Sequence, residues 1–206
     1  ERIFFVWTDE RFLPQSHEDN YFNRVKPHLL CKAKGAAHFL PINTDSKTVH
    51  EAAEEYEKEV RNVLKACKKS GLDLALLDLG EDGHTAGLFT KEFYGNCYRA
   101  LKEDGIMVYQ HGSPFYDEDE DTCRAMHRKA SHSFPISRVY QAHIPTCASG
   151  YWLFGFTSKK YHPLTDLNVE RWKERNIKTW YYTTNLHKGA FMLPRYVEDM
   201  LEEEEN

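Results

Sequence analysis

The chain has 206 residues, of which 41% are hydrophobic, 14% aromatic and 29% charged, with a formal net charge of -5. This composition predicts a globular chain with a sizeable core and excludes a disordered one. The acidic balance, without a basic stripe, argues against nucleic acid as a partner, and no apolar run reaches the roughly 18 residues of a membrane helix. The acidic runs 117–121 and 202–205 are interpreted as solvated surface rather than metal sites.

The cysteines and the first residues bear on the compartment. The five cysteines are widely spread and form no Cys-x-x-Cys pair, which argues against a zinc site and against a disulfide framework. A reducing cytoplasm fits this usage best. Glu1 opens directly into an apolar run, so no secretory leader is expected.

The first third of the chain alternates between strand and helix patterns. A short apolar run over residues 2–7 predicts a strand, and residues 20–33 carry apolar side chains at helical spacing. The clearest helix covers residues 46–69, where Ser46 or Thr48 can act as the N-cap.

The middle of the chain continues the alternation. A near-continuous apolar run over residues 72–78 is typical of a central parallel strand. A glycine-containing loop then leads to a helix over about 90–101 and a buried strand over 105–110. A further helix begins in the acidic run and ends near Phe134.

The last part of the chain completes the predicted fold. Residues 136–143 and 151–158 form two strands close enough in sequence to pair antiparallel, and a final helix begins near Pro194. Strands separated by helices predict βαβ units with a sheet covered on both faces. We therefore predict a single α/β domain over residues 1–206, three-layered and Rossmann-like, with a mostly parallel sheet and an antiparallel hairpin at one edge. The strands expected to be parallel in one sheet are 2–7, 73–78 and 105–110.

Polar side chains follow two of these strands, at the carboxyl ends where ligands bind in such sheets. Arg11 follows the first strand and could clamp a phosphate with its fork of donors. Asp82 and His84 follow the strand 72–78, and a neutral histidine can take a proton from water near neutral pH. The alternative is a solvated loop histidine and a surface ion-pair cluster at residues 9–11.

Residues 1 to about 89 resemble 6-phosphogluconolactonase. The matching segments are 8–11, 16–21, 40–43 and 80–89, the last reading Gly-Glu-Asp-Gly-His-Thr-Ala-Gly-Leu-Phe. The resemblance implies hydrolysis of 6-phosphogluconolactone without a cofactor. It makes His84 the general base, with Asp82 orienting it, and it places Arg11 and Asn20 among the residues that bind the phosphosugar.

From about residue 87 to residue 201 the chain resembles spermidine synthase, a polyamine aminopropyltransferase. The matching segments are 87–94, 100–105, 110–114, 144–146, 181–183 and 187–194. The resemblance implies that Asp78 activates the diamine and that Gln110, Tyr181 and Tyr182 line its pocket; the alternative for the two tyrosines is simple packing. The reaction uses decarboxylated S-adenosylmethionine, and the matched region lacks the family's glycine-rich nucleoside loop.

The two resemblances meet near residues 78–89, and the sequence indicates a designed or recombined chimera. We expect no efficient catalysis, no cofactor and no metal. If the chain is active, weak lactone hydrolysis is expected, because that reaction alone needs no cofactor; the alternative is aminopropyl transfer. The expected ligand is a small phosphosugar or a polyamine, in the cytoplasm, without nucleic acid or membrane, and the oligomeric state stays open.

Overall fold

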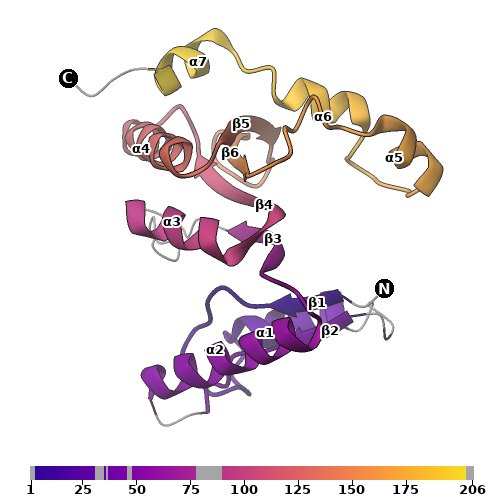
Figure 1. The fold of residues 1–206 in the computed structure, drawn as a ribbon. Coiled ribbons are helices and arrows are strands. Elements are labelled where there is room, and N and C mark those ends of the chain that lie inside the picture. Colours follow the sequence, from indigo (N-terminus) through magenta and orange to yellow (C-terminus); the bar gives the residue numbers. More distant parts are fainter. Residues whose placement is uncertain (1–2, 31–34, 36, 46–47, 78–89, 203–206) are drawn as a thin grey trace. The chain divides into compact units, whose positions relative to one another are not determined.

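The computed structural model describes residues 3–30, 35, 37–45, 48–77 and 90–202. The chain divides into a first unit, Glu1–Ser70, and a second unit, Gly71–Asn206 (Figure 1). The single α/β domain expected over the whole chain stays a prediction.

The first unit contains a two-stranded parallel sheet. Strand β1 (Ile3–Val6) pairs with β2 (Ala37–Leu40), a strand that no sequence pattern predicted. The described strands form two sheets, this pair and a four-stranded sheet in the second unit, where the sequence predicted one. Helix α1 (Tyr21–Val25) precedes β2 and continues as a π-helix over Lys26–Leu30.

Helix α2 (Val49–Ala66) confirms the long helix predicted in the first unit. The Thr48 hydroxyl caps it by accepting a hydrogen bond from the Glu51 backbone N–H at 3.1 Å. Tyr56 ties the helix to both strands, because its hydroxyl accepts from the Trp7 N–H at 2.6 Å and donates to the Leu40 carbonyl at 3.1 Å. Tyr56, Val60 and Leu64 are half-buried on one side of the helix, whereas Glu54, Glu57 and Lys58 are exposed.

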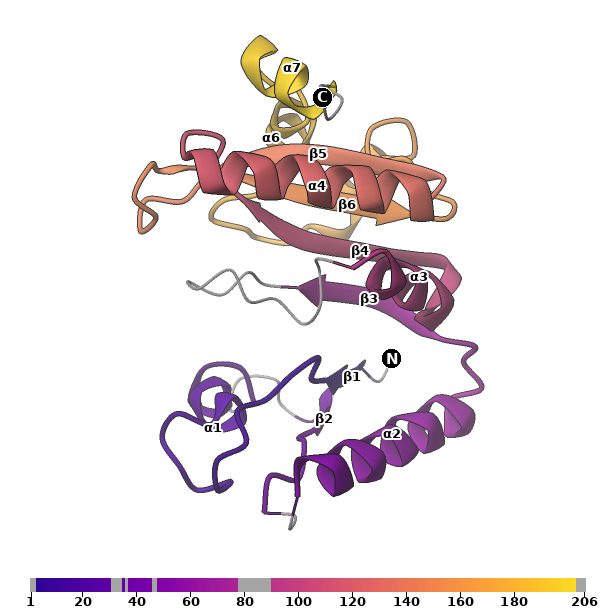
Figure 2. The same cartoon turned by 90° about the vertical axis from the view of Figure 1, so that its left-hand side faces the viewer.

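The second unit contains a four-stranded sheet in the order β3-β4-β6-β5 (Figure 2). Strands β3 (Leu72–Leu77) and β4 (Leu101–Gly112) are parallel, as predicted. Strand β6 (Tyr151–Ser158) runs antiparallel to both β4 and β5 (Ile136–His143). The antiparallel hairpin predicted at the sheet edge is therefore confirmed with its expected bounds.

Helices cover both faces of this sheet, which confirms the three-layer α/β class. Figure 1 shows α3 (Lys91–Ala100) and α4 (Asp117–Ser133) on one face, with α5 (Val169–Arg175) and α6 (Thr184–Ala190) on the other. The last helix, α7 (Arg195–Glu202), begins directly after Pro194, as expected. Among the described helices, none combines the length and apolar character needed to cross a bilayer.

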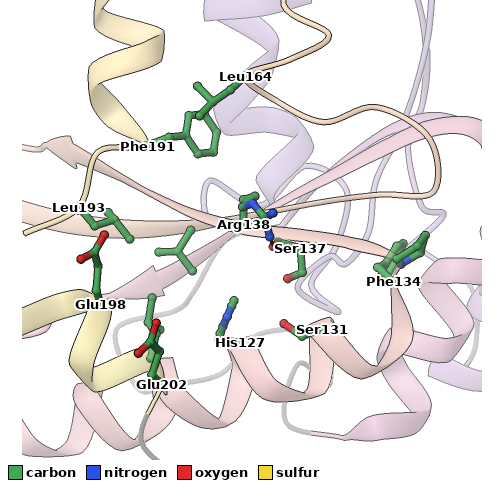
Figure 3. Close-up of a pocket in the computed structure, with 13 residues that line it drawn as sticks. His127, Ser131, Phe134, Ser137, Arg138, Leu164, Phe191, Leu193, Glu198 and Glu202 are labelled. Atoms are coloured by element: carbon green, nitrogen blue, oxygen red, sulfur yellow. Dashed lines mark hydrogen bonds between the residues drawn. The ribbon is translucent and has the colours of Figure 1, made fainter. Parts of the chain in front are cut away.

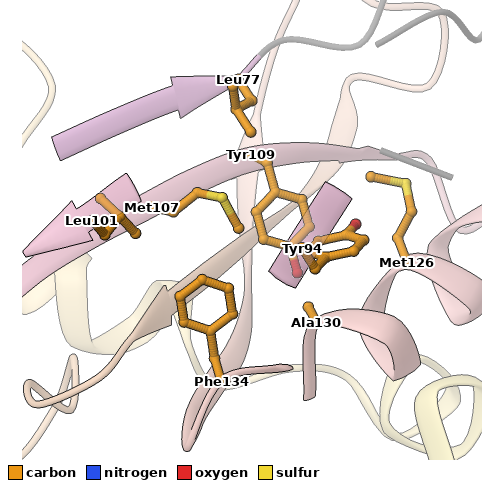
Figure 4. Close-up of a cluster of buried hydrophobic side chains, with 8 residues drawn as sticks. All are labelled: Leu77, Tyr94, Leu101, Met107, Tyr109, Met126, Ala130 and Phe134. Atoms are coloured by element: carbon orange, nitrogen blue, oxygen red, sulfur yellow. The ribbon is translucent and has the colours of Figure 1, made fainter. Parts of the chain in front are cut away.

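The core of the second unit lies between β4 and the helices α3 and α4. The odd-numbered β4 residues point to this side, and Met107 and Tyr109 are fully buried against Tyr94 and Met126 (Figure 4). The rings of Tyr94 and Tyr109 meet edge to face with centroids 5.8 Å apart. The even-numbered residues of β4 consequently point to the other face, where α5 and α6 lie.

Candidate functional site

The residues predicted to form a site are divided between the two units. Arg11 and Asn20 belong to the first unit, and Gln110, Tyr181 and Tyr182 to the second. The three residues expected to carry the chemistry lie outside the described residues, and their roles stay predictions: Asp78, Asp82 and His84.

Arg11 is exposed in the loop that follows β1. Its guanidinium lies over the ring of Tyr21, 5.2 Å from the ring centroid. A hydrogen bond with Tyr21 raises the pKa of Arg11. The guanidinium is therefore charged and accessible, as an anion-binding group must be.

Asn20 is almost fully buried and acts as the N-cap of α1. Its side-chain oxygen accepts from the Asn23 N–H at 3.4 Å, and its Nδ2 donates to the Thr44 hydroxyl at 3.3 Å. Both bonds stay within the first unit, so the geometry assigns Asn20 a structural role. Substrate binding by Asn20 stays a prediction.

Glu10 has a role that sequence reasoning missed. One oxygen of its carboxylate accepts from the Tyr21 N–H at 2.7 Å and from the Arg11 N–H at 2.8 Å, and the other accepts from the Phe22 N–H at 2.9 Å. These N–H groups at the start of α1 have no partner within the helix. Glu10 therefore anchors α1 and orders the loop that carries Arg11, instead of belonging to a surface ion-pair cluster.

In the second unit, Gln110 shares a sheet face with an aromatic row. Cross-strand register places Gln110 opposite Phe154 and Phe154 opposite Tyr140, and side chains directly opposite one another point to the same face. The rings of Phe154 and Tyr140 stack with centroids 5.3 Å apart. We call this surface, made of these three residues, the Gln110 face.

Tyr181 lies near Tyr140. Burial raises the pKa of Tyr140 to about 12, and nearby Tyr181 contributes to the rise. Tyr181 is itself 58% exposed. The register places Gln110 and Tyr140 on one face of the sheet, and Tyr181 lies near Tyr140 although 70 residues separate it from Gln110 in sequence.

Tyr182 is held in place by a network that includes His187. Its ring packs edge to face on Trp172, with centroids 4.6 Å apart, and its hydroxyl lies 3.2 Å from His187 Nδ1. His187 Nε2 lies 2.8 Å from the carbonyl of Pro163, which can only accept, so Nε2 carries the hydrogen and Nδ1 accepts from the phenol. The geometry favours the packing alternative for Tyr182 and gives His187 a positioning role, which no sequence signal indicated.

Possible metal ligands were also compared for their spacing in the described residues. Within residues 3–77 and 90–202, as far as the structure describes them, no three acidic, histidine or cysteine side chains gather closely enough to hold a metal ion.

Comparison with known proteins gives similarities of two kinds. Residues 1–114 match the family model described as glucosamine-6-phosphate isomerases/6-phosphogluconolactonase. The match covers more than half of the chain, and the chain belongs to this family. It also extends the first resemblance beyond residue 89, where the sequence motifs ended.

The relatives of the other part are aminopropyltransferases. The polyamine aminopropyltransferase of Agathobacter rectalis is 80% identical over 123 residues, which is 60% of this chain and 43% of the relative. That of Streptococcus pneumoniae is 76% identical over 123 residues, again 43% of its length. The crystal structure of spermidine synthase from Thermotoga maritima is 29% identical, with a TM-score of 0.63, over 88% of this chain and 55% of that chain.

These matches confirm the resemblance to two families. A 123-residue match is longer than the chain that follows residue 114, so the two similarities overlap. The chain spans about half the length of the curated relatives it matches.

Proposed function

We propose that the second unit binds a diamine or polyamine at the Gln110 face, as part of aminopropyl-transfer chemistry. The observation that carries this proposal is the cross-strand row of Gln110, Phe154 and Tyr140 on one face of the sheet, with Tyr181 near Tyr140. The 80% identity to a protein named polyamine aminopropyltransferase supports it.

The Gln110 face has the groups that an aliphatic ammonium requires. The side-chain carbonyl of Gln110 can accept from an N–H, and the phenol rings of Tyr140 and Tyr181 attract a cation through their faces. The ring of Phe154 lies between Gln110 and Tyr140 in the cross-strand row, where methylene groups of the ligand would pack.

Asp78 is the proposed base for the transfer. It directly follows Leu77, which pairs with Tyr109, the neighbour of Gln110 on β4. The amine nitrogen attacks the aminopropyl carbon of decarboxylated S-adenosylmethionine, the carbon–sulfur bond breaks to leave a thioether, and Asp78 takes the proton from the nitrogen. Catalysis is inefficient under this proposal, because the residues before β3 resemble the other family. A recombined chain would have this arrangement.

Binding of 1,4-diaminobutane tests the proposal. This amine is what remains of spermidine when its aminopropyl group is removed, and isothermal titration calorimetry measures its affinity for the intact chain. Replacing Gln110 or Tyr181 with alanine should weaken binding about five- to tenfold, the size expected for losing one contact of about 1 kcal/mol.

A matched control lies at the other end of the sheet. Tyr161 follows β6 beyond Ser158, which pairs with Ile106, far along β4 from Gln110. Tyr161→Ala should leave the affinity unchanged. Equal losses in all three variants, or no binding by the parent chain, would contradict the proposal.

Lactone hydrolysis is a second candidate, favoured by membership of residues 1–114 in the lactonase family and by the accessible guanidinium of Arg11. In this mechanism His84 takes a proton from the water that attacks the lactone carbonyl, Asp82 orients His84, and Arg11 holds the phosphate. The phosphosugar lactone would be the substrate, and no cofactor takes part.

Measuring how much faster the lactone is hydrolysed with the chain than without it tests this candidate. The rate should fall as pH drops through the titration of His84, because only the neutral imidazole accepts a proton. His84→Ala should abolish the excess rate, whereas Asp78→Ala, which belongs to the transferase chemistry, should preserve it. Equal loss in both variants would instead point to a folding defect.

A further inference from the structure

The second unit contains a cavity of about 560 Å³ beside the edge strand β5, between α4 and α7 (Figure 3). Small-molecule sites commonly measure about 300–1,000 Å³. None of the residues of the Gln110 face lines this cavity.

Charges of opposite sign lie on opposite walls of this cavity. Arg138 of β5 donates to the Ser137 carbonyl at 2.9 Å and to His162 Nε2 at 3.2 Å, and among the described residues it has no carboxylate partner. Glu198 and Glu202, one turn apart on α7, likewise have no ion pair within the part of the chain that the structure describes. Figure 3 shows the two carboxylates across the cavity from Arg138.

An unsatisfied polar atom lies on the wall between them. His127 Nδ1 is buried and has no hydrogen-bond partner among the described residues. Burial lowers the pKa of His127, and the charge of Arg138 lowers it further, so the imidazole is neutral and can both donate and accept. A ligand that supplies the missing hydrogen bond of such an atom is bound more tightly, because the buried polar atom is then satisfied.

The remaining wall is apolar. Leu164, Phe191 and Leu193 lie over the part of the cavity between the two charged walls (Figure 3). An aliphatic chain that connects two charged ends would pack against these side chains.

We infer that this cavity binds a small aliphatic amino carboxylate, with its carboxylate on Arg138 and its ammonium between Glu198 and Glu202. A diamine would place a second ammonium against Arg138, and a dicarboxylate would place a second carboxylate against the glutamates. Both arrangements are repulsive, so the charge pattern selects a zwitterion over either symmetrical ligand.

Three probes of equal length test the inference: 6-aminohexanoate, 1,6-diaminohexane and hexanedioate. Calorimetry is carried out on the full chain carrying Tyr181→Ala, so that binding at the Gln110 face contributes little. We expect 6-aminohexanoate to bind at least about tenfold more tightly than the other two. Shorter and longer amino carboxylates, from four to eight carbons, locate the preferred spacing.

Substitutions of the charged residues should change the preference in a predictable direction. Arg138→Gln should weaken 6-aminohexanoate binding about tenfold and reduce its advantage over the diamine. Glu198→Gln combined with Glu202→Gln should weaken it equally and reduce its advantage over the dicarboxylate. Arg175→Gln and Glu174→Gln, both exposed on α5, should change nothing.

The outcomes separate this inference from the proposed function. Because Tyr181→Ala weakens diamine binding at the Gln110 face about five- to tenfold and leaves the cavity lining intact, comparing it with the parent chain shows which site a probe occupies. Equal affinity for the three probes, no binding at any chain length, or losses in the α5 variants matching those at the cavity would each overturn the inference. Near-ultraviolet circular dichroism of each variant verifies that the second unit is folded.

Discussion

Replacing Gly155 with alanine should lower the free energy of unfolding of the second unit by about 3 kcal/mol or more. A Cβ atom at this position of β6 would lie 2.2 Å from Cζ of the Tyr109 ring. That ring cannot retreat, since it is fully buried and meets Tyr94 on its other side (Figure 4). Urea unfolding followed by near-ultraviolet circular dichroism measures the effect.

Two further variants identify the cause of the loss. Gly189→Ala, in α6, meets no atom within 4 Å and should leave stability unchanged or raise it by up to about 1 kcal/mol. In a Tyr109→Leu background, Gly155→Ala should cost less, because the clashing ring is absent. The same cost in both backgrounds would show that the Tyr109 ring is not what excludes a side chain at Gly155.

The stability of the second unit should also fall steeply in acid because of His111. This side chain of β4 is fully buried and stacks on Tyr109 with centroids 5.0 Å apart. Neither ring nitrogen has a partner among the described residues. Burial, followed by the neighbouring His127 of α4, lowers the pKa of His111 to about 3.

The direction of the effect follows from the proton balance. In the unfolded chain His111 titrates near the ordinary value of about 6.5, whereas in the folded chain it stays neutral to about pH 3. Between these values only the unfolded state binds the proton, so the stability present above pH 6.5 is lost as pH falls. The loss approaches about 1.4 kcal/mol per pH unit, or about 2–3 kcal/mol between pH 6.5 and 4.5.

Urea unfolding at these two pH values, on the parent chain and on His111→Phe, measures this contribution. The variant lacks the titrating group and should lose much less stability between pH 6.5 and 4.5. His132→Gln, exposed on α4, serves as the control and should keep the full pH dependence of the parent. A His111→Phe chain with the parent's pH dependence would show that other groups cause the acid sensitivity.

Elements with strong periodic patterns could be predicted from the sequence, and those that depend on tertiary contacts could not. Buried residues alternate with less buried ones along most of the strand over 151–158 and in the first half of the strand over 136–143, and the bounds of both were correct. Strand β2 has only four residues, including His38, and is recognisable only through its pairing with β1. The predicted sheet therefore contained residues 2–7, 73–78 and 105–110 and lacked β2.

The candidate site shows the same division. Gln110 and Tyr181 could be selected only through a family resemblance, because no spacing connects residues on β4 and in the segment before α6. The carboxylate of Glu10 accepts hydrogen bonds at a helix start eleven and twelve residues later, and His187 has a partner in the carbonyl of Pro163. Such contacts depend on how loops fold back, and local patterns carry no information about them.

The strand order of the second unit also bears on how its sheet assembles. The hairpin of β5 and β6 closes over a short loop, whereas the parallel pairing of β3 with β4 requires the whole crossover through α3. Closing a longer loop costs more chain entropy before any contact compensates for it, so we expect the sheet to nucleate at the hairpin and to grow through β4. Strand β3, held from one side only and with Leu74 and Leu76 more than half exposed, would then dock last and detach first.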